Sequence, residues 1–165
     1  MSAVELAASR HLDHPASELW DLLSDPEAHV AAYAEVGSRD VEVLDADVGD
    51  DVVELTIVRR VDPAVPPVVR HLVPATITVT STDRWEHQAD GSVTGRSDLA
   101  VDGLPVRAVG RAEIVDEPGG CRYDLTVAVP TPGPMVGPGA SLVRGVLQHH
   151  LDAQLDAAEA VLAGR

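Results

Sequence analysis

The sequence predicts an α+β fold, in which a curved antiparallel sheet of six to seven strands wraps around one long C-terminal helix. Three observations support this prediction. Over residues 52–130, apolar and polar residues alternate in short stretches that Gly, Pro and Asp interrupt, which is typical of antiparallel strands. Two short helical segments follow the first strand-like stretch. Over residues 141–163 the apolar residues recur every three or four positions, which indicates an amphipathic helix.

The N-terminal part predicts one strand and two short helices. Residues 4–12 alternate between apolar and polar side chains and indicate the first strand. Pro15 begins a short helix, because proline is tolerated in a first helical turn, and its leucines and Trp20 gather on one side. Asp25 is a suitable cap for a second helix, which has Pro26 in its first turn and ends near Gly37.

The middle of the chain predicts six more strands, joined mainly by tight turns. The segment 62–74 holds four prolines and cannot be a central strand. We expect a loop there, with a short helical piece at 68–73, lying across the mouth or edge of the sheet. The predicted strands span 40–48, 52–61, 76–86, 92–101, 106–115 and 121–129.

The C-terminal helix is predicted to pack on the sheet with one face. A Gly- and Pro-rich linker at 130–139 precedes it. The apolar stripe of the helix, which Val146 widens, recurs at steps of three and four residues. It consists of Val143, Leu147, Leu151, Leu155, Ala158 and Leu162.

Length and charge restrict the class of protein. The chain has 165 residues and a formal net charge of −15. At this length we expect one domain over residues 1–165, and the charge opposes binding to nucleic acid or to an anionic membrane. No apolar run approaches the roughly 18 residues of a membrane helix, and residues 1–10 do not resemble a signal peptide. We therefore expect a cytoplasmic protein without membrane insertion, and its oligomeric state stays open.

The predicted inner face of the sheet carries unusually small side chains, which suggests a cavity. Side chains alternate across a strand, and this parity places Gly95, Ser97, Ala108, Gly110 and Ala112 inward. The chain has no Phe, two Trp and two Tyr, so few large side chains are available to fill the space. Either a small molecule occupies the space between sheet and helix, or the helix lies close against the small residues.

Few polar side chains share the inward faces. A buried Arg59 would need a carboxylate such as Asp83 or an anionic ligand group, unless its strand end reaches solvent. Ser97 and Tyr123 could orient a ligand, although Tyr123 also suits a core position. His150 could act in the cavity as an acid, a base or a hydrogen-bond donor, or be a partly exposed helix residue. The predicted walls are Gly110, Ala112, Leu125 and Val127 from the sheet and Leu147, Leu151 and Leu155 from the helix.

Other kinds of site lack their sequence patterns. His149 and His150 are adjacent on a helix, so their side chains diverge by about 100° and cannot hold one ion together. The sequence contains neither HExxH nor CxxC. Because no Gly-rich phosphate loop precedes a helix either, we expect no metal and no cofactor. Cys121 is the single cysteine and cannot form an internal disulfide.

The order of the predicted elements resembles the START-like helix-grip (SRPBCC) superfamily, which includes polyketide cyclases, pollen-allergen relatives and lipid-transfer domains. The stretch Pro15-x-x-x-x-Trp20-x-x-Leu23-x-Asp25-Pro26 is similar to the entry of that superfamily. Residues 58–60, 82–85 and 129–137 resemble an uncharacterised family within it, from high-G+C bacteria. The resemblance implies a sheet that grips the last helix around a hydrophobic cavity. It implies no single activity, and no residue matches a cyclase catalytic set.

Three functional hypotheses follow. The first is binding of a small hydrophobic or amphipathic molecule between sheet and C-terminal helix. The second is a cyclase, dehydratase or hydrolase that acts inside the cavity through His150 or Tyr123, so whether the protein is an enzyme stays open. The third is a ligand-free interaction module that uses the acidic surface and the Pro-rich segment.

Overall fold

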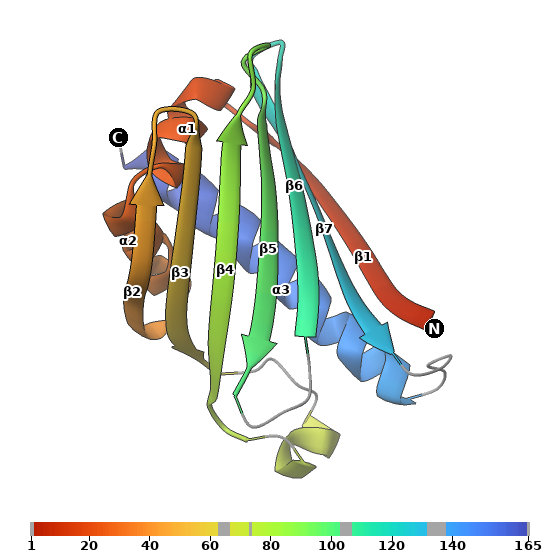
Figure 1. Ribbon diagram of the computed structural model, residues 1–165. Coiled ribbons are helices and arrows are strands. Elements are labelled where there is room, and N and C mark those ends of the chain that lie inside the picture. The colour runs from red at the N-terminus through yellow and green to blue at the C-terminus, as the bar shows by residue number, and fades with distance from the viewer. Residues whose placement is uncertain (1, 63–66, 73, 103–106, 132–137, 165) are drawn as a thin grey trace.

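A computed structural model describes residues 2–62, 67–72, 74–102, 107–131 and 138–164. It confirms the predicted α+β architecture: one curved antiparallel sheet holds the C-terminal helix α3 against its concave side (Figure 1). The elements are β1 (Ser2–Leu12), α1 (Ala16–Leu23), α2 (Pro26–Glu35), β2 (Arg39–Val48), β3 (Val52–Val61), η1 (Pro67–Leu72), β4 (Ile77–His87), β5 (Val93–Val101), β6 (Arg107–Glu117), β7 (Gly120–Thr131) and α3 (Pro138–Ala163).

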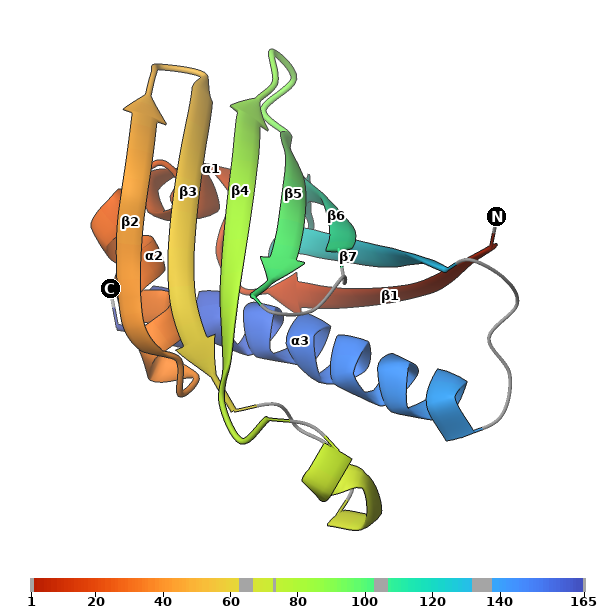
Figure 2. The same ribbon diagram turned by 60° about the horizontal axis from the view of Figure 1, so that its bottom comes forward.

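The seven strands form one open sheet in the order β1-β7-β6-β5-β4-β3-β2. The strands from β2 to β7 are sequential neighbours, and β1 pairs with β7. The β1 and β7 end of the sheet turns away from the direction of β2 to β4, so the sheet wraps around α3 (Figure 2). Arg10 of β1 holds α3 from the edge, because its guanidinium lies 2.6 Å from Asp156 and 3.1 Å from Glu159.

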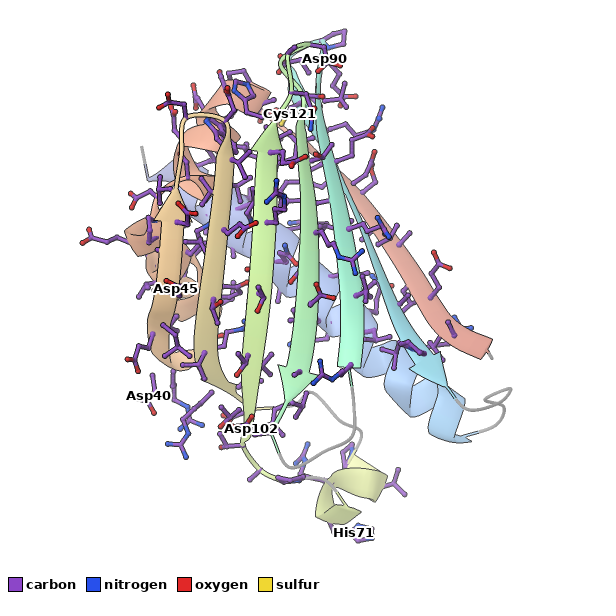
Figure 3. All side chains as sticks on the ribbon, in the orientation of Figure 1. Asp40, Asp45, His71, Asp90, Asp102 and Cys121 are labelled. Carbon is purple, nitrogen blue, oxygen red and sulfur yellow. The ribbon has the colours of Figure 1, made fainter. Side chains whose placement is uncertain are left out.

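Strand parity places the side chains as the sequence predicts. On β3, every second residue is buried, from Val53 through Leu55 and Ile57 to Arg59. On β6 and β7 the same rule buries Ile114 and Tyr123, among others, and leaves the charged residues outside. The inner face is therefore apolar with a few polar exceptions, and the acidic residues of the strands other than the buried Asp83 lie on the outer face and at the ends of the sheet. Figure 3 shows four of them, Asp40, Asp45, Asp90 and Asp102.

The hairpin between β4 and β5 explains one of the small inward residues. Gly91 adopts φ +88° in its turn, a conformation that favours glycine. The register set by this turn pairs Trp85 with Gly95. The buried Trp85 ring lies directly over Gly95, where an added Cβ would be 2.5 Å from Cε3. At this position, a large side chain fills the space.

Element boundaries differ slightly from the prediction. Helix α3 begins at Pro138 rather than at residue 141, because proline suits a first turn. The predicted helical piece at 68–73 is the 3-10 helix η1 (Pro67–Leu72), which lies beyond the end of β3 and the start of β4 and carries the exposed His71 (Figure 3). Residues 63–66, 73, Val106 and 132–137 of the predicted segments lie outside the described residues, as do the side chains of Val143 and Val146.

Candidate functional site

A pocket of about 360 Å³ lies between α2, α3 and the inner face of the sheet. It is at the end of the sheet where β3, β5 and β7 finish and β4 and β6 begin. Most of its wall is apolar. The apolar side chains that line it are Val36, Val61, Ile77, Val79, Leu99, Val101, Ala108, Val129, Leu147 and Ala153.

The size of the buried side chains differs between the two ends of the sheet. Near α1, the buried residues Trp85, Tyr123 and Leu155 fill the space between α3 and the sheet. Around the pocket, Ala108 of β6 and Ala153 of α3 stand in the wall instead. A methyl group extends little beyond the backbone. The side chains of Ala108 and Ala153 therefore do not fill the gap between the sheet and α3 at this end.

Arg59 is the charged side chain that the sheet places at the inner end of this pocket. It is 2% exposed, which excludes the alternative of a strand end in solvent. Its guanidinium carbon lies 4.1 Å from the centre of the Tyr33 ring, a cation–π contact. Its Nη1 donates a hydrogen bond of 3.4 Å to Ser81 Oγ. Tyr33 belongs to α2, so this contact joins the short helix to the sheet.

Asp83 is close to Arg59 but does not form an ion pair with it. Ser97 donates a hydrogen bond to Oδ1 of Asp83, and Ser81 donates one of 3.4 Å to Oδ2. Burial raises the pKa of the Asp83 carboxyl, because the charged form loses its hydration. Among the described residues, no carboxylate oxygen lies within 4.0 Å of a nitrogen of Arg59. The hydrogen bonds of Asp83 are made with serines.

His150 enters the pocket from α3 and is half-buried. Burial, and then the positive charge of Arg59, lower the pKa of its imidazole to about 4. The ring is therefore neutral at pH 7 and can donate one hydrogen bond and accept another. Gln154, one turn further along α3, also lines the pocket, and its Nε2 lies 3.5 Å from the hydroxyl of Tyr123. Burial raises the pKa of that hydroxyl.

The structure distributes the predicted site residues over several places. Arg59, Leu147 and His150 line the main pocket. Tyr123 lines a separate hollow of about 60 Å³ beside α1 and α2. Leu155 is a core residue that borders neither of these two pockets. A narrow hollow of about 20 Å³, room for one water, is bordered by Ser97, Gly110, Ala112, Leu125, Val127, His150 and Leu151.

The sequence does not predict three of the polar and small side chains at the pocket, Tyr33, Ala153 and Gln154. Tyr33 comes from α2, whose orientation over the sheet is set by tertiary packing rather than by strand parity. Gln154 and Ala153 lie on the flank of the apolar stripe of α3. The spacing of Leu147, His150 and Gln154, three and four residues apart, is the signal that could have found Gln154.

Metal and membrane features are not present in the described part of the chain. No three His, Cys, Asp or Glu side chains described here lie together so that they could hold a metal ion. Among the described helices, none is long and apolar enough to cross a membrane.

Comparisons with known proteins place the chain in a family. The family described as "Protein of unknown function (DUF2505)" matches residues 7–162. None of the curated proteins compared with the sequence matches it. The chain therefore belongs to the DUF2505 family.

Solved structures share its fold at low sequence identity. The Zhui aromatase/cyclase from Streptomyces sp. R1128 is 17% identical, with TM-score 0.62 over 96% of this chain and 93% of that one. The STAR-related lipid transfer protein from Xanthomonas axonopodis is 18% identical, with TM-score 0.65 over 96% and 85%. A START superfamily protein from Mycobacterium smegmatis is 14% identical, with TM-score 0.58 over 94% of each chain. The fold is the START-like helix-grip fold, as the sequence resemblance predicts.

Proposed function

We propose that this member of the DUF2505 family binds a small, largely apolar molecule between the sheet and α3. The observation that carries the proposal is the pocket of about 360 Å³ with its apolar walls. Its volume is within the range of about 300–1,000 Å³ that is usual for small-molecule sites. Two proteins of the same fold are described as a lipid transfer protein and an aromatase/cyclase, which supports the binding of a small molecule by this fold.

The apolar walls supply the main part of the binding free energy. Burial of about 200 Å² of apolar ligand surface would contribute about 5 kcal/mol, at about 25 cal/mol per Å². Association costs several kcal/mol of lost motion, so polar contacts must add to this for tight binding. Arg59, His150 and Gln154 can provide such contacts, since all three line the pocket.

Binding fits the chemistry of the pocket better than proton-transfer catalysis. A general base works best when its pKa is close to the working pH. The pKa of His150 is about 4, so the neutral ring is a weak base at pH 7. Burial raises the pKa of Tyr123, which lines the separate hollow. These properties suit side chains that orient a ligand, and we therefore propose binding in preference to the cyclase, dehydratase or hydrolase hypothesis.

Native mass spectrometry of the protein purified from the cells that naturally produce it tests the proposal. We expect one small molecule per chain, released when the protein is denatured. The matched control is the Ala153→Phe variant purified in the same way. Ala153 lines the pocket, and a helical Phe side chain points toward the preceding turn, where His149 and His150 also line the pocket. An adduct that is equally abundant in both proteins would show that the molecule binds elsewhere.

A further inference from the structure

The described residues use little of the hydrogen-bonding capacity of Arg59. A guanidinium carries five N–H donors and stays charged at all ordinary pH values. Over the described residues, its hydrogen bonds amount to one of 3.4 Å, to Ser81 Oγ, and the Tyr33 ring covers one face. The side chain is 2% exposed and lines the pocket, so solvent reaches little of it. A buried cation with unused donors needs a partner that the pocket can admit.

The nearby carboxylates are already engaged. Asp83 accepts hydrogen bonds from Ser81 and Ser97. Asp62, at the rim of the pocket, lies 2.6 Å from Arg39 and accepts a second hydrogen bond, from Thr76, at 2.9 Å. Asp62 is also 67% exposed, so water screens its charge. Neither carboxylate is within ion-pair distance of Arg59, and the inner end of the pocket keeps a positive charge in a chain of net charge −15.

The groups around Arg59 favour an anion with one negative charge. His150 and Gln154 line the same pocket and are neutral hydrogen-bonding groups. Arg59 is the one arginine or lysine among the described lining residues. A planar guanidinium fork matches the two oxygens of a carboxylate. A phosphate carries up to two negative charges and three acceptor oxygens, for which one enclosed cation is insufficient.

We infer that the pocket takes an apolar monocarboxylic acid, whose carboxylate is bound by Arg59 and whose apolar body lies against β4, β5 and α3. This inference rests on the proposed function and names the chemical class of its ligand. The body would contact Val79, Leu99 and Leu147. Arg59 is thus a binding residue, and its cation–π contact with Tyr33 holds the guanidinium at the inner end of the pocket.

Isothermal titration calorimetry at pH 7.5 with three ligands of equal chain length tests the inference. The ligands are decanoate, 1-decanol and decyl phosphate. Charge-assisted hydrogen bonds predict that the wild-type protein binds decanoate about 10- to 100-fold more tightly than decanol. The variant Arg59→Met keeps an unbranched apolar stem and removes the guanidinium with its charge, and we expect it to bind both ligands with similar affinity. Arg59→Lys should retain part of the preference.

The matched control is Arg60→Met. Arg60 is the next residue of β3 and points to the outer side, where it is 57% exposed and 3.3 Å from Asp40. This variant should keep the full preference for decanoate. Circular dichroism verifies the fold of each variant, and the wild-type ratio decides the question even where Arg59→Met does not fold.

Each result separates the inference from the proposed function. Equal binding of decanoate and decanol by the wild-type protein would overturn the carboxylate site and leave the proposed function standing. Tighter binding of decyl phosphate than of decanoate would overturn the ligand class. Failure of all three ligands to bind would overturn both. Loss of the preference in Arg60→Met to the same degree as in Arg59→Met would show that overall charge, rather than the buried guanidinium, selects the acid.

Discussion

The contact between Trp85 and Gly95 predicts that the same substitution has different effects on stability at two inward glycines. In Gly95→Ala, the new Cβ would be 2.5 Å from Cε3 of the buried Trp85 ring, whereas carbon atoms pack at about 3.5–4.0 Å. The ring or the backbone must therefore move by about 1 Å. Overpacking of this kind costs about 1–3 kcal/mol, and the lower entropy of the unfolded alanine chain offsets about 0.5–1 kcal/mol. We expect a net loss of about 1–2 kcal/mol in the free energy of unfolding.

Gly110→Ala is the matched control. Gly110 lies on the same inner face, but an added Cβ there meets Ser97 Cβ at 3.4 Å, an ordinary contact. Its free energy of unfolding should stay within about 0.5 kcal/mol of the wild-type value or exceed it. Urea unfolding, followed by far-ultraviolet circular dichroism and extrapolated linearly to water, measures both variants. Equal stabilities for the two variants would refute the view that Trp85 fills the space over Gly95.

Two titratable side chains, the buried Cys121 and the half-buried His150, give further predictions. Burial raises the pKa of the Cys121 thiol to about 11. We therefore expect Cys121 not to react with a disulfide reagent at pH 8 until a denaturant unfolds the protein. Rapid reaction in the native state would contradict the burial of this thiol. The pKa of His150 falls from 6.5 to about 4 on folding. As the pH is lowered, the imidazole of the unfolded chain therefore binds a proton at a higher pH than the imidazole of the folded protein does. The free energy of unfolding should therefore fall as the pH drops from about 6.5 to 4, by up to about 3 kcal/mol from this group. In His150→Gln this part of the slope should be absent, as measured by urea unfolding across that pH range, and an unchanged slope would show that folding does not lower the pKa of His150.

Much of the fold follows from local features of the sequence. The alternation along β5, β6 and β7 predicts which side chains face α3, and the structure buries Val93, Ile114 and Leu125 accordingly. Gly and Asp at the turns mark where strands end, because few other residues adopt the required backbone conformations. These features depend on neighbours in the sequence and can therefore be predicted from it.

The site depends on contacts between distant segments, which the sequence does not specify in the same way. Parity predicts that Trp85 and Gly95 both face inward, but only the register of the hairpin places the ring over the glycine. That register could have been inferred by counting outward from the turn at Asp90 and Gly91. The position of Tyr33 over Arg59 could not, because it depends on how α2 packs against β3.

The predicted wall of the cavity shows the same limit. Gly110 and Ala112 face inward as predicted, but they border a hollow of about 20 Å³. The larger space lies toward the other end of the sheet, near Ala108. Parity identifies the face of a strand, whereas the distance between α3 and the sheet varies along the helix with the size of the side chains between them. The two alanines that line the larger space, Ala108 and Ala153, come from distant parts of the chain.

The most direct test of the central claim, that the space between α3 and the sheet is a binding pocket, is a calorimetric binding isotherm of 1-decanol with three proteins. They are the wild type, Ala153→Phe and Ala157→Phe. Ala153 lines the main pocket. Ala157, one turn further along α3, is a core residue that is 4% exposed and lines the hollow of about 60 Å³. We predict saturable binding of one molecule to the wild type and at least about a tenfold weaker affinity in Ala153→Phe, whose ring occupies the pocket at little cost in stability. Ala157→Phe should instead lose about 1–3 kcal/mol of stability by overpacking and, where it folds, bind as the wild type does. Undiminished binding to a folded Ala153→Phe variant would contradict the account.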